Sequence, residues 1–176
     1  MLPKLYKDGF KGKIYATDVT CDLCDIMLRD SAHIQESEAK WRSRKAERAG
    51  LETYEPVYDM QDAVGAISLF RRCNYGEIIY PAEGIELRFT DIGHLLGSAC
   101  IELWLTEGTV HKKIVVSGDV GNTNQRIIRD PQQVAETDYL VIESTYGNRL
   151  HSADRSNVIL ELAGYIQKAL DRGGNV

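Results

Sequence analysis

The spacing of apolar residues predicts a helix followed by several strands in the middle of the chain. Residues 60–70 place apolar side chains at helical intervals after Asp59, a favoured helix N-cap. Residues 85–89 and 101–105 instead alternate between apolar and polar, and residues 114–116 form a short continuous apolar run. We therefore expect one core helix and then a group of neighbouring strands.

Turn-forming residues indicate how these strands connect. Residues 107–109 (EGT) separate the second and third strands by a short glycine-containing turn, which predicts a hairpin. The polar residues 122–131 form a loop, and the apolar run 139–142 predicts another buried strand. From Ser152 to Arg172, apolar residues recur at helical spacing and stop before two glycines, so we expect a helix there.

The first third of the chain contains a long, strongly polar segment. Residues 13–16 are β-prone, and Thr17 is placed to cap a helix that runs through Leu28. Residues 31–49 are rich in charge and stop at a glycine, which predicts an exposed helix or a mobile excursion. Within this segment, residues 40–48 (KWRSRKAER) have two interpretations: a solvated helix with i,i+4 ion pairs, or an RNA contact in which a tryptophan stacks on a base.

Together these elements predict an α/β fold with helices packed on a face of a sheet, rather than a regular βαβ alternation. The last residues, 174–176 (GNV), look like the start of a further strand. We therefore expect the fold to be truncated at this end.

Composition and charge narrow the functional classes. A chain of 176 residues with 43% apolar residues is long enough to bury a core. It has no apolar secretory signal and no run of roughly 18 apolar residues, so we expect a soluble, cytoplasmic protein. The formal net charge of −5 argues against nucleic-acid binding over the whole surface, because phosphate contacts need local clusters of Lys and Arg.

The four cysteines are too few and too scattered for a disulfide scaffold, and we expect free thiols. Cys21 and Cys24 lie three residues apart on a predicted helix and therefore share one face. We interpret them as packing residues rather than as a redox pair or half of a zinc ribbon, since no second pair exists.

Three polar residues follow predicted strands: His94, between two glycines, then Asp119, and then Glu143. Imidazole binds zinc well, and a carboxylate can bridge two metal ions. Each residue also has an ordinary interpretation, as a hydrogen-bonded loop histidine or as an acid that caps a turn. Their shared position after strands, where loops vary on a rigid sheet, favours a common site.

Three motifs around these residues resemble, in order and spacing, those of the β-CASP family of metallo-β-lactamase-fold RNA-processing nucleases. The motifs are residues 93–99 (GHLLGSA), 117–121 (SGDVG) and 143–147 (ESTYG), with further similarity at residues 2–17, 56–58 and 75–77. The family includes the cleavage and polyadenylation endonuclease subunit and ribonuclease J, and the chain is most similar to the polyadenylation-factor-like group. The resemblance implies a partial metallo-β-lactamase fold of the αββα type, zinc as cofactor and hydrolysis of RNA phosphodiester bonds.

The resemblance also implies residue roles. His94 matches a zinc-ligand histidine, and Asp119 matches the aspartate that bridges two zinc ions. Glu143 matches the acidic residue of the first β-CASP motif, which can orient a metal-bound water or a ligand histidine. It assigns no RNA-binding residue.

The family's main ligand motif, His-x-His-x-Asp-His, does not occur in the sequence, and it would precede Leu2. His33, His111 and His151 do not match the missing ligands. Because zinc sites need about three or four protein ligands, we expect partial or no zinc occupancy and no nuclease activity from this chain alone. Residues 1–176 are thus expected to form an incomplete metallo-β-lactamase domain that is truncated at both ends and lacks the β-CASP domain.

Two other functions stay open: a non-catalytic folding or interaction module, and a piece of a related hydrolase that acts on a small molecule. An incomplete sheet leaves unpaired edges, so we also expect a homodimer formed through them.

Overall fold

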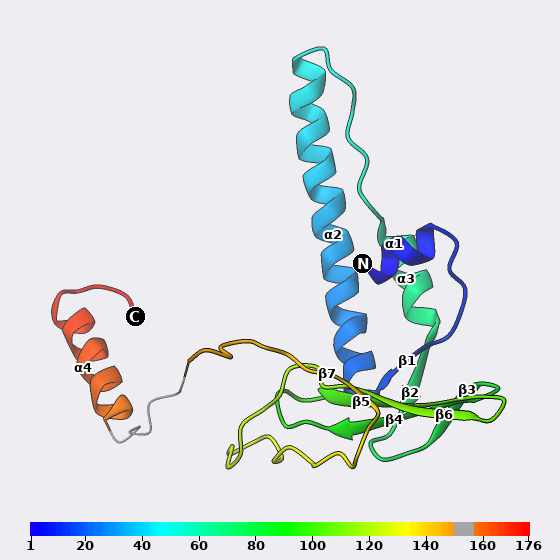
Figure 1. Ribbon diagram of the computed structural model, residues 1–176. Coiled ribbons are helices and arrows are strands. Elements are labelled where there is room, and N and C mark those ends of the chain that lie inside the picture. The colour runs from blue at the N-terminus through cyan, green and yellow to red at the C-terminus, as the bar shows by residue number, and fades with distance from the viewer. Residues whose placement is uncertain (150–156) are drawn as a thin grey trace. The chain divides into compact units, whose positions relative to one another are not determined.

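The computed structural model describes residues 1–149 and 157–176. The chain divides into two compact units, Met1–Glu143 and Ser144–Val176. The elements of the first unit are, in chain order, α1 (Leu2–Lys7), β1 (Ile14–Thr17), α2 (Asp18–Arg48), α3 (Met60–Ser68), β2 (Phe70–Cys73), β3 (Ile79–Ala82), β4 (Ile85–Asp91), β5 (Ala99–Glu107), β6 (Val110–Val116) and β7 (Tyr139–Val141) (Figure 1). This mixed α/β unit agrees with the expected fold class.

The main sheet has the strand order β3-β4-β5-β6-β7. Its neighbouring strands are antiparallel except for β6 and β7, which pair in parallel. Strands β1 and β2 form a separate parallel pair, and a single bridge between Tyr75 and Phe89 links the segment after β2 to β4. Strand β7 lies at an edge of the main sheet with all three of its residues exposed, which is where the expected self-association would occur. The homodimer itself stays a prediction.

The strands predicted after residue 84 are present, including the hairpin between β5 and β6, where Gly108 has φ +58°. The prediction that residues 139–142 are buried was wrong, because β7 is an edge strand and its three residues are exposed. Three elements were not predicted. Helix α1 is only six residues long, β2 contains two adjacent arginines, and β3 contains Pro81, which weakens the strand pattern. The core helix predicted for residues 60–70 ends earlier, at Ser68, and Phe70 begins β2 instead.

Helix α2 covers two segments that were predicted as separate elements, the helix through Leu28 and the polar residues 31–49. It runs without interruption for 31 residues, and the Thr17 hydroxyl accepts a hydrogen bond from the Thr20 amide, which confirms the predicted N-cap. Asp59 likewise caps α3, where a reciprocal hydrogen bond with Asp62 forms a capping box. Cys21 is buried in α2 and Cys24 is half-buried, and all four cysteines, each within the described residues, are free thiols.

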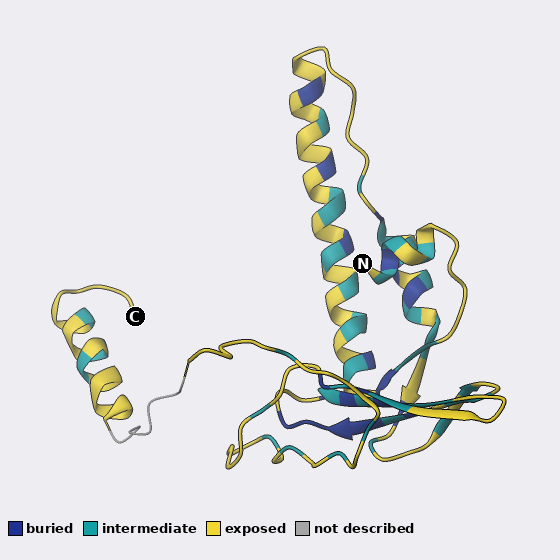
Figure 2. Cartoon of the chain, in the orientation of Figure 1, coloured by how far each residue is buried: buried dark blue, intermediate teal, exposed yellow. Residues whose placement is uncertain are grey.

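Both faces of the main sheet are partly covered. On one face, Leu87 and Phe89 of β4 form a core with Cys73 of β2. On the other face, Cys100 of β5 and Val115 of β6 pack with Ile92, and Val134 from the loop before β7 lies against them. Figure 2 shows buried residues in the strands and along one side of α2.

Glu102 in β5 is fully buried, although its strand alternates between apolar and polar residues. Its carboxylate accepts hydrogen bonds from Arg88 Nε at 2.8 Å and Thr90 Oγ1 at 2.6 Å, and Lys113 Nζ lies 2.7 Å away. Burial by itself raises the pKa of Glu102, but these hydrogen bonds outweigh it and lower the pKa to about 2. The residue therefore stays ionised inside the sheet layer.

In the second unit, α4 (Val158–Asp171) confirms the helix expected near the C-terminus, and none of its residues is buried. The predicted start of that helix, at Ser152, lies outside the described residues, as does His151. None of the described helices is long and apolar enough to cross a membrane.

Candidate metal centre

The sheet topology brings the three candidate residues to one edge. Strands β4 and β6 each pair antiparallel with β5, and β7 pairs parallel with β6, so the carboxyl ends of β4, β6 and β7 point the same way. His94 follows β4, Asp119 follows β6 and Glu143 follows β7. His94 Nε2 lies 3.9 Å from Asp119 Oδ2. The first two predicted site residues are therefore brought together.

Glu143 supports the loop that carries Asp119. The backbone amide of Val120 donates a hydrogen bond to Glu143 Oε1, and the amide of Glu143 donates to Ser117 Oγ at 3.2 Å. Its carboxylate thus holds the peptide next to Asp119, on the same loop. The role that the resemblance implied for Glu143, orienting a metal-bound water or a ligand histidine, stays a prediction.

The loop that carries His94 is held from several elements. The carbonyl of Gly97 accepts hydrogen bonds from Thr17 Oγ1 at 2.7 Å and Thr20 Oγ1 at 2.9 Å, both at the start of α2. Tyr75 donates its hydroxyl to the carbonyl of Ser98 at 2.8 Å. Burial raises the pKa of Tyr75, so this hydroxyl stays protonated.

Sequence reasoning missed Thr20 and Tyr75 as positioning residues. The threonine pair has the spacing of a helix cap, and Tyr75 lies in one of the segments that resemble the β-CASP family. Neither pattern shows which distant carbonyl the side chain reaches, 77 and 23 residues away respectively.

Gly121 allows the Asp119 loop to approach the His94 loop. Its amide donates a hydrogen bond to the carbonyl of Ile92 at 3.0 Å. A Cβ atom at position 121 would lie 1.7 Å from the carbonyl oxygen of Gly93, which is far inside van der Waals contact. Only glycine is compatible with this contact between the two loops.

A Gly121→Ala variant is therefore expected to push the loops apart and to lower the free energy of unfolding by about 1–3 kcal/mol. Chemical denaturation followed by circular dichroism measures this loss. Gly164→Ala is the matched control, because Gly164 has no atom within 4 Å of its added Cβ. The control replaces a glycine inside α4, where alanine favours the helix. Equal stability of the two variants would contradict the predicted clash.

His94 and Asp119 lie close enough together to supply two of the ligands of one zinc ion. Two ligand atoms that each lie ~2.0–2.2 Å from one zinc are at most ~4.4 Å apart, so the 3.9 Å between His94 and Asp119 is compatible with a shared ion. Both side chains are open to an incoming group, with exposed fractions of 40% and 73%. Among the described residues, no group of three or more His, Cys, Asp or Glu side chains is arranged to hold a metal. The described part of the chain thus presents two donors of a site.

The chain is similar to several curated proteins along nearly its whole length. No protein-family model matches the chain. Over 99% of its length it is 31% identical to a ribonuclease of Thermus thermophilus, of which it covers 35%. It is 30% identical to transcription termination factor FttA of Pyrococcus abyssi over 100% of its length, and to an RNase J-like protein of Methanocaldococcus jannaschii over 93%.

The chain covers 25% of the Pyrococcus factor and 34% of the Methanocaldococcus protein, so it spans about a quarter to a third of the length of the curated relatives it matches. The aligned span covers the positions of all three candidate residues. Relatives named as a ribonuclease, an RNase J-like protein and a transcription termination factor thus support the resemblance of this chain to the metallo-β-lactamase-fold β-CASP family of RNA nucleases.

Proposed function

We propose that this chain contributes part of the metal centre of a zinc-dependent ribonuclease that hydrolyses RNA phosphodiester bonds. The observation that carries the proposal is the approach of His94 Nε2 to within 3.9 Å of Asp119 Oδ2, at the carboxyl ends of β4 and β6. The alignment with relatives named as ribonucleases supports RNA as the substrate class.

Each residue has a distinct part in the proposed site. His94 would bind one zinc ion through Nε2, and Asp119, with two carboxylate oxygens, would lie between two ions. When bound, zinc supplies an activated water near neutral pH and neutralises charge on the attacked phosphate. Glu143 holds the amide of Val120 and thereby fixes the direction in which Asp119 projects.

The described residues supply only part of such a site. Zinc sites in proteins use about three or four ligands, and the described residues bring two together. We propose that the remaining ligands come from residues outside the described ranges and that the 176-residue chain alone does not cleave RNA. The free thiols of all four cysteines suit a reducing compartment, so we place the protein in the cytoplasm.

The zinc content of the purified chain tests the metal part of the proposal. We expect substoichiometric zinc that falls to background in a His94→Ala/Asp119→Ala variant. Equal zinc in both proteins would place the metal elsewhere and overturn these ligand assignments. No zinc in either would support the alternative of a non-catalytic module and move the metal chemistry to other residues.

Assays on the natural protein, at the length its cells express, test the reaction. We expect cleavage of single-stranded RNA that stops on chelation and returns when zinc is restored. Hydrolysis of a small ester or lactam without RNA cleavage would instead favour a related small-molecule hydrolase. Cleavage by the homogeneous 176-residue chain would contradict the proposed incompleteness of its site.

A further inference from the structure

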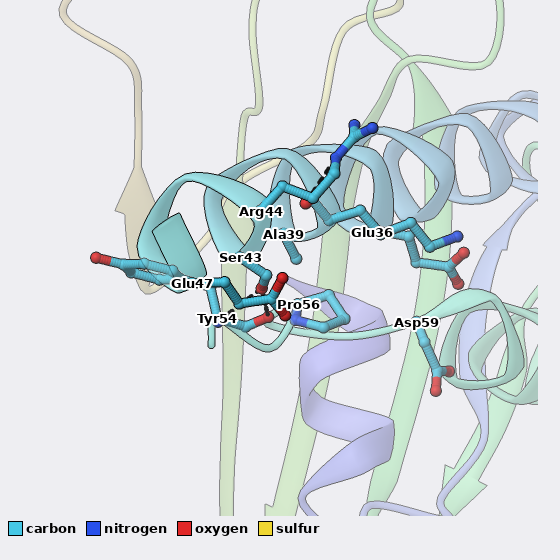
Figure 3. A pocket seen from close by; sticks show the side chains of 9 residues that line it. Glu36, Ala39, Ser43, Arg44, Glu47, Tyr54, Pro56 and Asp59 are labelled. Atoms are coloured by element: carbon cyan, nitrogen blue, oxygen red, sulfur yellow. Dashed lines mark hydrogen bonds between the residues drawn. The ribbon is translucent and has the colours of Figure 1, made fainter. Parts of the chain in front are cut away.

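The outer half of α2 is an ordered arm because the segment after it folds back along one face. Ala39 and Ala46 are buried beneath this returning segment, residues 49–59. Ser43 Oγ accepts a hydrogen bond from the Tyr54 amide at 2.8 Å and donates to the Tyr54 carbonyl at 3.0 Å. Figure 3 shows Ser43 and Tyr54 facing each other on this side of the helix.

Two further contacts hold the base of the same arm. Glu36 accepts a hydrogen bond from the amide of Met60 at 2.8 Å, and the hydroxyls of Ser31 and Tyr58 lie 2.7 Å apart. An isolated helix of this kind is only marginally stable in water, and side-chain contacts with a partner segment supply the missing stability. The arm can therefore present its outward side chains in a fixed arrangement.

The outward face carries one aromatic ring and three cations. Trp41, Arg44, Lys45 and Arg48 follow the spacing i, i+3, i+4 and i+7, which places them on a single helix face. At about 100° per residue this face lies opposite the buried alanines. The four side chains line a hollow of about 420 Å³. In Figure 3 the side chain of Arg44 points away from Tyr54 and Pro56.

The residues that line this hollow include no acidic side chain. Glu36 and Glu47 line a second hollow, on the side of the returning segment, and Arg44 borders that hollow as well. Arg42 pairs with Glu38 at 3.7 Å, whereas Arg44, Lys45 and Arg48 take part in none of the ion pairs found among the described residues. The interpretation of residues 40–48 as a helix covered by i,i+4 pairs thus holds for Arg42 alone. A chain with a net charge of −5 has here the local basic cluster that binding to phosphates requires.

Trp41 adds a feature that charge alone does not explain. Its side chain is 59% exposed, and Lys45 Nζ lies 5.6 Å from the centre of its ring. An exposed aromatic ring within a basic groove is the arrangement with which proteins bind single-stranded nucleic acid, because bases stack on the ring while cations contact the backbone.

We propose that the outward face of α2, formed by Trp41, Arg44, Lys45 and Arg48, binds single-stranded RNA outside the metal centre. The choice of RNA rests on the proposed function, whereas the binding mode rests on the geometry of this face. A base stacks on Trp41, and neighbouring phosphates contact the three cations. Paired RNA keeps its bases inside the helix, so it binds this face more weakly.

The salt dependence of binding tests the cations. Binding of a fluorescein-labelled oligouridine of about 20 nucleotides is followed by anisotropy in a chelating buffer, where no zinc-dependent cleavage takes place. Each lost phosphate contact lowers the slope of log K against log salt by ~0.7 for a single strand, so an Arg44→Gln/Arg48→Gln variant should lower it by ~1.4. A Lys13→Gln/Arg29→Gln variant, with the same change in net charge, should keep the original slope. Equal slopes in the two variants would overturn the proposal.

A separate variant tests whether bases stack on the Trp41 ring. Trp41→Ala should weaken oligouridine binding at least ~5-fold through loss of base stacking, and Tyr80→Ala, which removes another exposed aromatic ring, should not. If Trp41→Ala binds as wild type and polyglutamate competes equally well, the face is a general polyanion surface and the proposal fails. Because binding is measured without cleavage, normal binding by a natural-length protein that cleaves no RNA even with zinc would count against the proposed function alone.

Discussion

Replacing Asp119 with asparagine is expected to lower RNA cleavage by the natural protein at least ~100-fold. Residues that only orient metal ligands typically change activity by ~10–100-fold when mutated, and Asp119 is assigned as a ligand itself. Asparagine keeps the size of the side chain but removes the negative charge that would lie between two cations. Asp119 is 73% exposed, so the same change should hardly affect folding. Initial cleavage rates of a labelled RNA, with a melting curve for each protein, measure both effects.

Two other carboxylates serve as comparisons. Glu143→Gln should reduce cleavage by ~10–100-fold, because the weaker acceptor holds the Val120 amide less firmly. Glu136 is an exposed residue of the loop between β6 and β7, which also carries Asp119. Glu136→Gln should leave the rate of RNA cleavage unchanged. A normal rate for Asp119→Asn would remove Asp119 from the metal centre, whatever the behaviour of the other two variants.

Local patterns were sufficient to predict much of the fold. Period-two alternation located β4 and β5, and the caps at Thr17 and Asp59 located the starts of α2 and α3, because each signal involves residues within one or two turns. Helix α1 and strands β2 and β3 gave no such signal. They are four to six residues long. Strand β2 is specified by pairing with the distant β1, and β3 by pairing with the adjacent β4.

The candidate site was only partly predictable for the same reason. His94, Asp119 and Glu143 could be recognised because each lies in a motif, and the strand directions explain why they meet at one edge. The contact of Thr17 with the Gly97 carbonyl joins residues 80 positions apart. No spacing along the chain indicates such a contact, so the positioning of the His94 loop became visible only in the structure.

Strand β5 shows a failure of the alternation rule. Polar residues at alternate positions normally face water, and the sequence around Glu102 fits that pattern. In the structure, the loop between β6 and β7 lies over this face, with Val134 against the core and the Ala135 carbonyl accepting a hydrogen bond from Lys113 Nζ at 3.4 Å. Glu102 is consequently buried among cations instead of being hydrated.

A Glu102→Ala variant is accordingly expected to lose about 3–5 kcal/mol of unfolding free energy, because it leaves uncompensated charge inside the protein. The Lys113 side chain is only 11% exposed and would lose its partner, while Arg88, at 32%, can reach water more easily. Urea denaturation at neutral pH measures the loss. Glu86→Gln, at an exposed position of the adjacent strand β4, should change stability by less than ~0.5 kcal/mol.

The pH dependence of this loss has a defined direction. The pKa of Glu102 is lowered from its ordinary value of 4.5 to about 2 in the folded chain. The contribution of the ionised carboxylate is therefore complete above the ordinary pKa and declines as the pH falls toward the folded value. A Glu102→Gln variant, which is always neutral, should approach wild-type stability between about pH 4.5 and pH 2. A constant difference across this range would show that ionisation of Glu102 is not the cause.

A double variant separates the ion pair from packing. Glu102→Leu alone leaves the Lys113 ammonium buried beside Trp104, whose ring centre is 5.0 Å away. Glu102→Leu/Lys113→Met removes both charges and fills the space with apolar groups, which is often neutral or stabilising. We therefore expect the double variant to be more stable than Glu102→Leu, although it departs from the natural sequence at one further position. If the second substitution instead adds its own loss, the pair is not coupled, and Glu102 is held mainly by Arg88 and Thr90.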